Sequence, residues 1–344
     1  MSDLTEVRSE DAFDIAAVHS WLRQLIPELS SLPKVSQFRS GASNLTYLLR
    51  YPNRDLVLRR PPFGVKAASA HDMRREVMIQ SALAPHFPYV PQIVGFSDDP
   101  TIMSSDFYVM EAIAGTILRR DLPKGSELSR DQASAIGDSM ISAWVKLHSV
   151  DPDILEPLNK GDGYVSRQVE GWSKRYRAAL TDDVPDGEDV MKWLEVNQLP
   201  DVKHCVIHGD WRLDNLVLNL DDSTLTGVLD WELATVGDPL MDLGSSLAYW
   251  IDPDDPIDFA HLRRQPSNLP GMPSRQEIVR RYQELSGTDC DNFLFYEIFG
   301  LFRLSVIIQQ IWIRYRLGQT TNPAFAEFGN AVNVLMARAK NLMQ

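Results

Sequence analysis

The chain has 344 residues, of which 44% are hydrophobic, so it is long and apolar enough for a globular protein with two lobes, each with its own core. Its formal net charge of −13 argues against a general nucleic-acid-binding surface, because phosphate backbones attract fields of Lys and Arg. The two cysteines, Cys205 and Cys290, exclude a disulfide framework and indicate a reducing compartment. The N-terminus lacks the basic and apolar regions of a signal peptide, so we expect a cytoplasmic protein.

The spacing of apolar residues predicts where helices and strands form. In the N-terminal third it predicts helices over 9–29 and 69–83, the second capped by Ser69, and strands within 35–50 and over 55–60, 92–96 and 106–111. In the rest of the chain it predicts helices over 129–149, 165–180, 190–197, 238–249, 274–285, 291–317 and 322–343. Charged and amide residues interrupt the apolar stretch 293–313, which indicates a buried helix rather than a membrane span.

One stretch in the middle of the chain carries most of the chemical information. It reads His-Gly-Asp-Trp-Arg-Leu-Asp-Asn over 208–215, then Leu-Val-Leu-Asn-Leu over 216–220, and Val-Leu-Asp-Trp-Glu over 228–232. The turn-forming residues at 221–224 separate two apolar runs, so the pattern predicts a strand pair with polar residues at its ends.

Asp210, Asn215 and Asp230 stand at those ends, and we expect them to meet at one edge. Phosphoryl transfer from a nucleotide needs a carboxylate that orients the acceptor hydroxyl and oxygen ligands for magnesium. We interpret Asp210 as that carboxylate, and Asn215 and Asp230 as the metal ligands. The alternative is a His-Gly-Asp turn in which Asn and Asp are ordinary turn residues.

These segments resemble the catalytic and metal-binding segments of protein kinases, with Gly209 where those have Arg and Asp-Trp-Glu in place of Asp-Phe-Gly. More closely, they resemble the aminoglycoside phosphotransferase family, whose loop reads His-Gly-Asp with an Asn five residues after the Asp. The Ser-Asn-x-Thr-Tyr pattern at 43–47 is also similar to the loop of that family. The resemblance implies an α+β, protein-kinase-like two-lobe fold, with a small antiparallel-sheet N-lobe and one main helix over 1–114 and a mainly helical C-lobe over 115–344.

The resemblance further implies a nucleotide site in the N-lobe. A turn with Gly41, Ser43 and Asn44 would fold backbone N–H groups over phosphates, because Gly permits close approach. An ordinary hairpin turn remains an equally open interpretation.

In a kinase-like N-lobe the third strand carries a Lys that contacts the phosphates and pairs with a Glu on the next helix. Arg59 stands at the matching position, and the period of two places it on the same face as Val57. We expect Arg59 to contact phosphate, and Glu76 to hold it, although Glu76 could also be a solvated surface residue. Arg60 and Lys66 stay open as alternatives to Arg59.

The resemblance also implies a hinge at Glu111 to Ile113, whose backbone groups would pair with the adenine edge. His208 and Asp242 would support the catalytic loop without touching the substrate. His148, at the end of a long helix, is interpreted as structural rather than catalytic.

The acceptor pocket is expected in the segment before the catalytic loop. Trp172, Arg175 and Tyr176 could line it, but helical spacing favours the core for the two aromatic residues. Arg303, Arg314 and Arg316 could meet an anionic acceptor, with salt bridges on a helix pair as the alternative.

Together these features predict an enzyme that uses ATP, or less readily GTP, and Mg²⁺ to phosphorylate a hydroxyl group of a small molecule. The Leu-Arg-Arg-Pro-Pro run and the Phe-Tyr-Val-Met-Glu strand resemble the phosphotransferase-like branch associated with acyl-CoA dehydrogenases, which implies a hydroxyacyl acceptor. An aminoglycoside acceptor and a non-catalytic nucleotide-binding scaffold remain as alternatives. No nucleic-acid or membrane partner is expected, and the sequence leaves the oligomeric state open.

Overall fold

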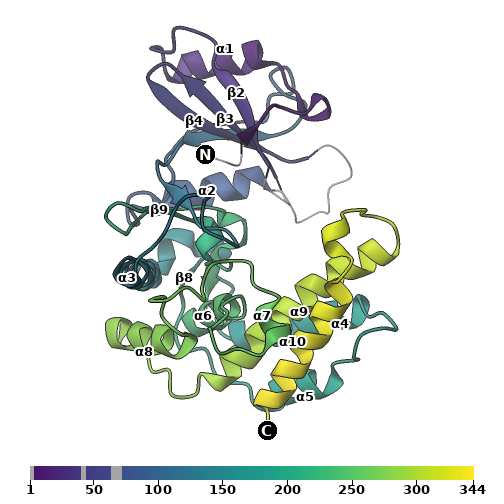
Figure 1. Cartoon of the computed structure of the whole chain (residues 1–344). Helices are drawn as coiled ribbons and strands as arrows, with labels where there is room; N and C mark the ends of the chain where they lie inside the picture. The colour runs from purple at the N-terminus through teal and green to yellow at the C-terminus, as the bar shows by residue number, and fades with distance from the viewer. Residues whose placement is uncertain (1–3, 40–43, 63–71) are drawn as a thin grey trace. The chain divides into compact units, whose positions relative to one another are not determined.

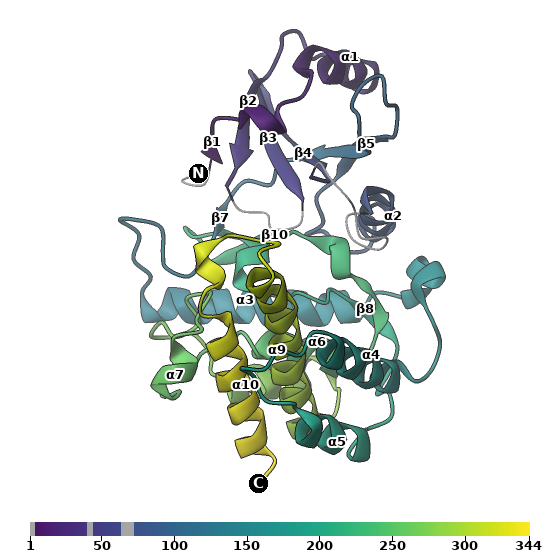
Figure 2. The same cartoon turned by 90° about the vertical axis from the view of Figure 1, so that its right-hand side faces the viewer.

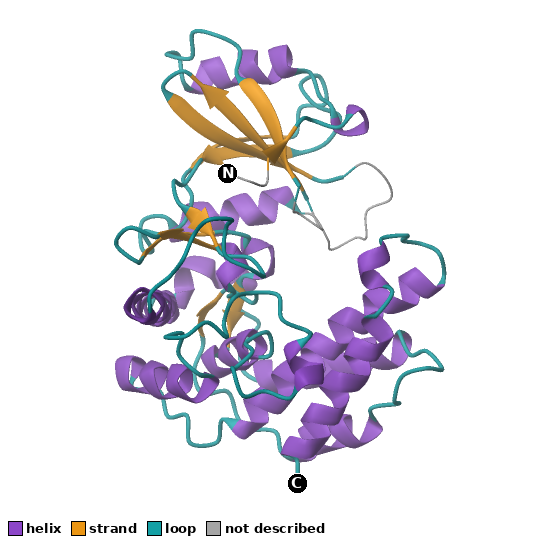
Figure 3. Cartoon of the chain, viewed as in Figure 1, coloured by secondary structure: helices purple, strands orange, loops and turns teal. Residues whose placement is uncertain are grey.

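A computed structural model describes residues 4–39, 44–62 and 72–344 of the chain (Figure 1). The chain divides into two compact units. The first, here called the sheet unit, comprises Met1–Thr116, Val217–Asn219 and Thr226–Glu232; the second, the helical unit, comprises Ile117–Leu216, Leu220–Leu225 and Leu233–Gln344. Strands dominate the first unit and helices the second (Figure 3).

The sheet unit is built on a six-stranded sheet with the order β1-β2-β3-β4-β6-β5, in which neighbouring strands are antiparallel. The strands are β1 (Leu4–Thr5), β2 (Lys34–Phe38), β3 (Leu45–Tyr51), β4 (Arg54–Arg60), β5 (Ile93–Ser97) and β6 (Phe107–Glu111). Successive residues of β4 face opposite sides, so Leu56 and Leu58 join one core cluster and Val57 joins another. The predicted alternation along this strand is confirmed.

One helix packs on each face of this sheet. Helix α1 (Ile15–Leu25) packs on the face of Leu58, and α2 (Met73–Leu83) on the face of Val57. Both helices start later than predicted, because aspartates cap them: Asp14 accepts the N–H groups of Ala16 and Ala17, and Asp72 accepts that of Arg75. The predicted cap Ser69 lies outside the described residues, and the capping side chain is Asp72.

The middle of the chain forms further short strands. Strands β9 (Leu216–Asn219) and β10 (Thr224–Val228) form the predicted pair and share a three-stranded sheet with β7 (Thr116–Ile117), in the order β10-β9-β7. Strand β8 (Cys205–Ile207) pairs with β11 (Thr235–Gly237) in an antiparallel arrangement. We did not predict β8 and β11, because three residues are too short to show a period. Strands β8 and β9 flank the loop 208–215.

The helical unit contains α3 (Arg130–His148), α4 (Tyr164–Ala178), α5 (Glu188–Val196), α6 (Pro239–Leu247), α7 (Ile257–Ala260), α8 (Arg275–Ser286), α9 (Leu294–Arg316) and α10 (Phe328–Leu342). Helix α9 lies beside α10 (Figure 2) and also packs against α4 and α6. Ser129 and Ser274 start α3 and α8 with capping boxes, and the second of these was predicted.

Two glycines let α6 and α9 approach each other closely. A Cβ atom on Gly300 would lie 2.0 Å from the carbonyl oxygen of Gly244, and one on Gly244 would lie 2.2 Å from that of Tyr296. The helix backbones are therefore in direct contact at this crossing. The crossing fixes the position of α6, which carries Asp242.

Among the described helices, α9 is long and apolar enough to cross a membrane, but 67% of its most apolar window is buried inside the protein. This burial agrees with the predicted packed helix. The cytoplasmic location stays a prediction.

Candidate active site

The loop between β8 and β9 brings Asp210 and Asn215 together, as the sequence predicted. The Nδ2 of Asn215 donates to the Asp210 carboxylate and to the Asp210 carbonyl oxygen, both at 2.9 Å. Arg212 reaches the same carboxylate, with Nη2 donating to Oδ2 at 3.0 Å and Nε lying 2.9 Å from Oδ1. Asp210 is thus held from two sides, and its side chain remains 17% exposed, which keeps it accessible to a ligand.

Sequence reasoning missed Arg212. Its guanidinium lies over the Tyr249 ring, 4.5 Å from the centroid, and 3.4 Å from Asp214. Burial lowers the pKa of Arg212, but the carboxylate of Asp210 and its other neighbours outweigh this effect and raise it. The sequence signal was an Arg flanked by Asp two residues away on each side, which places one cation between two carboxylates.

Asp242 supports the backbone of the loop 208–215. It is 2% exposed, and it accepts the N–H groups of His208 at 3.2 Å and of Gly209 at 2.8 Å. The indole Nε1 of Trp144 and the Nε2 of His148 lie 3.0 and 3.1 Å from its Oδ2. Burial alone would raise the pKa of Asp242, and the hydrogen bonds from His148 and Trp144 outweigh burial and lower it.

The two histidines of this region are both buried. Burial lowers the pKa of His148 more than Asp242 raises it, so the ring is neutral at physiological pH. A carboxylate can only accept, so the Nε2–H of His148 donates to Asp242 and its Nδ1 accepts from the hydroxyl of Tyr282 at 2.7 Å. His208 Nδ1 accepts the N–H of Asp210 at 3.2 Å. Both histidines therefore fix the loop.

Gly209 adopts a backbone conformation that favours glycine, with φ of +80°. A Cβ atom there would lie 2.9 Å from the carbonyl oxygen of Leu233. A larger residue would therefore displace the backbone immediately before Asp210.

The sheet unit holds a second cluster of predicted residues. The Nη2 of Arg59 lies 3.4 Å from Glu76 Oε2 and 3.0 Å from Asp230 Oδ1. Glu76 is 1% exposed, and it accepts from the Tyr108 hydroxyl at 2.8 Å and from Asn44 Nδ2 at 3.1 Å. Burial raises the pKa of Glu76, and the charge of Arg59 and the hydrogen bond from Tyr108 offset this only in part.

Asp230 adopts an unusual backbone conformation just after β10. Its φ of +68° is in the left-handed region, which Asp tolerates better than most residues and which often marks functional positions. The following residue, Trp231, is fully buried and donates to the Val228 carbonyl at 2.9 Å, and Val228 donates to the Tyr89 carbonyl at 2.7 Å. These bonds hold Asp230 in the sheet unit.

The structure bears on the two alternatives to Arg59 as the residue that contacts phosphate. Arg60 is fully buried and donates to the Tyr47 hydroxyl and to the Asp11 carbonyl oxygen, so it belongs to the core of the sheet unit. Lys66 lies outside the described residues, as do Gly41 and Ser43. Contact between Arg59 and phosphate stays a prediction.

At the predicted hinge, two of the three backbone N–H groups already donate to other strands or loops of the sheet unit. The N–H of Glu111 donates to the Gln92 carbonyl at 2.9 Å, and that of Ala112 donates to the Asp55 carbonyl at 3.2 Å. Of the three N–H groups at 111–113, that of Ile113 has no hydrogen-bond partner among the described residues. Adenine binding at this position stays a prediction.

Asn215 and Asp230, the residues proposed to hold the metal, carry the oxygen ligands that Mg²⁺ prefers. Among residues 4–39, 44–62 and 72–344 there is no group of three His, Cys, Asp or Glu side chains that could hold a metal. Mg²⁺ in nucleotide sites needs only one or two protein carboxylates, because phosphates and water complete its shell. The Oδ1 of Asn215 and the Oδ2 of Asp230 have no partners within the described part of the chain. The meeting of Asp230 with Asp210 and Asn215 stays a prediction.

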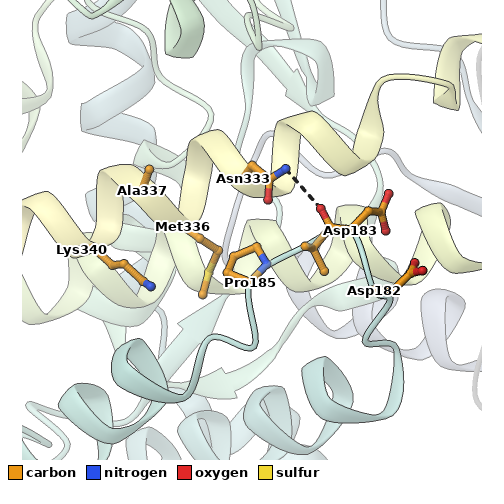
Figure 4. A pocket seen from close by; sticks show the side chains of 8 residues that line it. Asp182, Asp183, Pro185, Asn333, Met336, Ala337 and Lys340 are labelled. Carbon is orange, nitrogen blue, oxygen red and sulfur yellow. Dashed lines mark hydrogen bonds between the residues drawn. The ribbon is translucent and has the colours of Figure 1, made fainter.

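An open pocket of about 420 Å³ lies elsewhere in the helical unit (Figure 4). Lys340 lies at one end and Asp182 and Asp183 at the other, with Pro185 and Met336 between them. None of the predicted site residues lines this pocket.

Comparisons with known proteins show which proteins this chain is similar to. A family model described as "Phosphotransferase enzyme family" matches residues 34–278. "Acyl-CoA dehydrogenase family member 10" of Mus musculus is 35% identical over 328 residues, which cover 94% of this chain and 30% of that protein. The chain thus spans less than half the length of the curated relatives that it matches.

Two solved structures are similar over nearly the whole chain. A putative aminoglycoside phosphotransferase from Ralstonia eutropha is 28% identical, with a TM-score of 0.81 and coverage of 96% of this chain and 98% of that one. A choline kinase from Cryptosporidium parvum is 13% identical, with a TM-score of 0.66 and coverage of 95% and 96%, a likeness in fold. The predicted α+β, kinase-like fold is confirmed.

Proposed function

The chain belongs to the phosphotransferase enzyme family, and on that premise we propose that it transfers the γ-phosphoryl group of ATP to a hydroxyl group of a small molecule. The observation that carries this proposal is the Asp210 carboxylate, which Arg212 and Asn215 hold while Asp242 fixes the backbone of the loop. A preorganised carboxylate is what the reaction requires, because phosphoryl transfer depends mainly on positioning and charge neutralisation.

In the proposed reaction Asp210 accepts a hydrogen bond from the acceptor hydroxyl and takes its proton as the new bond forms. The acceptor oxygen bonds to the γ-phosphorus, the bond from that phosphorus to the β,γ-bridging oxygen breaks, and ADP leaves with the bridging oxygen. Arg212 and Asn215 keep the carboxylate oriented throughout.

On the nucleotide side, Arg59 would bind the phosphates while Glu76 holds its guanidinium. Arg makes bidentate contacts with phosphate and keeps its charge, so the replacement of the usual Lys is compatible with catalysis. Asn215 and Asp230 would hold Mg²⁺, which when bound neutralises negative charge on the β- and γ-phosphates. Release of Asp230 from Arg59 would leave both of its oxygens available.

For the acceptor, we propose a hydroxyacyl-type metabolite. The relatives that match nearly the whole chain are named as acyl-CoA dehydrogenase family members, and this supports an acyl compound over an aminoglycoside. The aminoglycoside alternative rests on the name of a structural relative.

Release of ADP in the presence of ATP and Mg²⁺, with panels of hydroxyacyl compounds and aminoglycosides, tests the proposal. Asp210→Ala should abolish turnover and leave nucleotide affinity nearly intact. Asp222→Ala, in the exposed turn between β9 and β10, is the matched control and should keep both. Comparable turnover by Asp210→Ala would remove that residue from its role. Nucleotide binding by the wild type without ADP release on any acceptor would favour a non-catalytic scaffold.

A further inference from the structure

Among the described residues, one buried arginine beside the loop 208–215 has no Asp or Glu at ion-pair distance. Arg303 on α9 is 8% exposed, and its Nη2 donates to the carbonyl oxygen of Gly209 at 2.8 Å. Within the described part of the chain, no Asp or Glu lies at ion-pair distance from it. The other buried arginines are committed, since Arg59 pairs with carboxylates and Arg60 binds a hydroxyl and a carbonyl oxygen.

Most of the N–H donors of Arg303 have no hydrogen-bond partner among the described residues. A guanidinium has five N–H donors, and the bond to Gly209 uses one of them. None of the Arg303 nitrogens is both sealed from solvent and without a partner, so the remaining donors can reach a ligand. Burial of a charge without a counter-ion costs free energy, and a bound anion would offset that cost.

A second arginine adds to this positive field. The guanidinium carbons of Arg303 and Arg175 lie 5.2 and 4.7 Å from the ring centroid of Trp172 on α4. The two charges therefore lie within about 10 Å of each other, comparable to the screening length of physiological salt. Arg175 is exposed and has no ion-pair partner among the residues that the structure describes. Trp172 is only half-buried, so the predicted core position applies to Tyr176, which is fully buried, and not to Trp172.

Arg303 lies beside the loop that carries Asp210. Gly209 immediately precedes Asp210, so Arg303 contacts the same loop as the carboxylate that would orient the acceptor. The Arg303 guanidinium donates to the Gly209 carbonyl oxygen at 2.8 Å, one residue away from the Asp210 carboxylate. A small acceptor that reaches Asp210 with a hydroxyl group can therefore reach Arg303 with another group.

We propose that Arg303 and Arg175, together with Trp172, form the subsite that binds an anionic group of the acceptor. The inference rests on the proposed function, and it specifies the acceptor as a hydroxyl compound that also carries an oxyanion, either a carboxylate or a phosphate. A cationic acceptor is disfavoured at this subsite, because both arginines repel it. Arg303 acts as a specificity-determining residue and takes no part in the transfer of the phosphoryl group.

Binding measurements test the subsite without requiring turnover. Isothermal titration calorimetry on the full chain compares hydroxycarboxylates of increasing chain length with their primary amides and with the corresponding amino alcohols. Glycerol phosphate and inorganic phosphate form a separate arm, which distinguishes a phosphate from a carboxylate as the bound group. The same titrations are repeated with Asp210→Ala, which should bind these compounds although it does not turn over.

Arg303→Gln is the decisive variant, and Arg314→Gln is its matched control. Arg314 lies on the same helix and is exposed, and among the described residues it donates only to the Gln310 carbonyl oxygen. We expect the wild type to bind an oxyanion compound more tightly than its amide and amine analogues, and Arg303→Gln to lose roughly ten- to hundredfold in that affinity. Arg303→Lys should recover part of it, and Arg314→Gln should leave it unchanged.

The proposal is overturned if the wild type binds amides or amines as well as the oxyanions, if no oxyanion of the panel binds, or if Arg303→Gln keeps the preference. A folded Arg175→Gln variant checks the second charge, and an unchanged affinity would remove Arg175 from the subsite. These results are separable from the reaction itself. Oxyanion binding through Arg303 without ADP release contradicts the proposed function and supports the subsite. ADP release that is the same in the wild type and in Arg303→Gln supports the proposed function and contradicts the subsite.

Discussion

Replacement of Asp242 by Asn tests how the loop 208–215, which carries Asp210, is held. The substitution keeps the shape of the side chain and removes its charge and one acceptor. Asp242 Oδ2 accepts from the His208 N–H, Trp144 and His148, while Oδ1 accepts from the Gly209 N–H at 2.8 Å. An Asn that keeps its oxygen at the three-donor position must point its NH₂ group at the Gly209 N–H.

The magnitude follows from this arrangement. One buried N–H loses its acceptor, which costs about 1–3 kcal/mol, and the other hydrogen bonds change from charge-assisted to neutral. We therefore expect a loss of about 3–5 kcal/mol in the free energy of unfolding, a large part of the ~5–15 kcal/mol that is typical of folded proteins. Displacement of Asp210 by as little as ~1 Å would lower turnover about hundredfold.

Denaturant unfolding and amide hydrogen exchange measure the two effects separately. Exchange at His208 and Gly209 should accelerate by roughly thirtyfold if local opening becomes ~2 kcal/mol easier. Asp238→Asn is the matched control. Asp238 is the fully buried N-cap of α6, the helix that contains Asp242, and it accepts the N–H groups of Leu240, Met241 and Val202. That variant should lose stability without selective exchange in the loop.

The reasoning about Asp242 would be refuted by an Asp242→Asn protein with unchanged unfolding and unchanged exchange at 208–209. It would also be refuted if both aspartate variants accelerated exchange in the loop equally, since the effect would then be global.

Three further predictions concern stability. Gly300→Ala would set a methyl group 2.0 Å from the Gly244 carbonyl oxygen. We therefore expect the free energy of unfolding in urea to fall by about 1–3 kcal/mol. An unchanged unfolding midpoint would contradict the close crossing of α6 and α9. Burial holds the pKa of His148 below its ordinary value, so the unfolded state takes up a proton first and the free energy of unfolding declines as the pH falls below about 6.5. His148→Gln should flatten this decline. Identical slopes of unfolding free energy against pH in the two proteins would disprove the assignment. Arg59→Met leaves buried Glu76 without its ion-pair partner, and we expect it to lower the free energy of unfolding by about 3–5 kcal/mol. Adding Glu76→Gln should restore part of that loss. Strictly additive losses in thermal unfolding would show that the two residues are not coupled.

Local patterns were sufficient to predict much of the fold and part of the site. The alternation along β4 placed Arg59 on the face of Val57, where Glu76 also lies. The short spacing between Asp210 and Asn215 placed both in one loop, and their side chains are in contact. These predictions succeeded because the period of a strand and the reach of a short loop leave few alternatives.

Contacts between distant residues were beyond such patterns. Trp144 and His148 reach Asp242 across 98 and 94 positions of the chain, and no periodicity in the sequence connects them. Helical spacing placed Trp172 in the core, but spacing alone does not reveal that two arginines lie against its ring.

The discontinuous make-up of the sheet unit has a practical consequence for anyone dividing this protein into fragments. A fragment that stops at Thr116 would omit Val217–Asn219 and Thr226–Glu232, and with them the carboxylate that pairs with Arg59 and the amide that bonds to Tyr89. Such a truncated product would be missing pieces of its own interior. A self-contained version would need those later segments restored, for example by a designed linker that bypasses the intervening hundred or so residues.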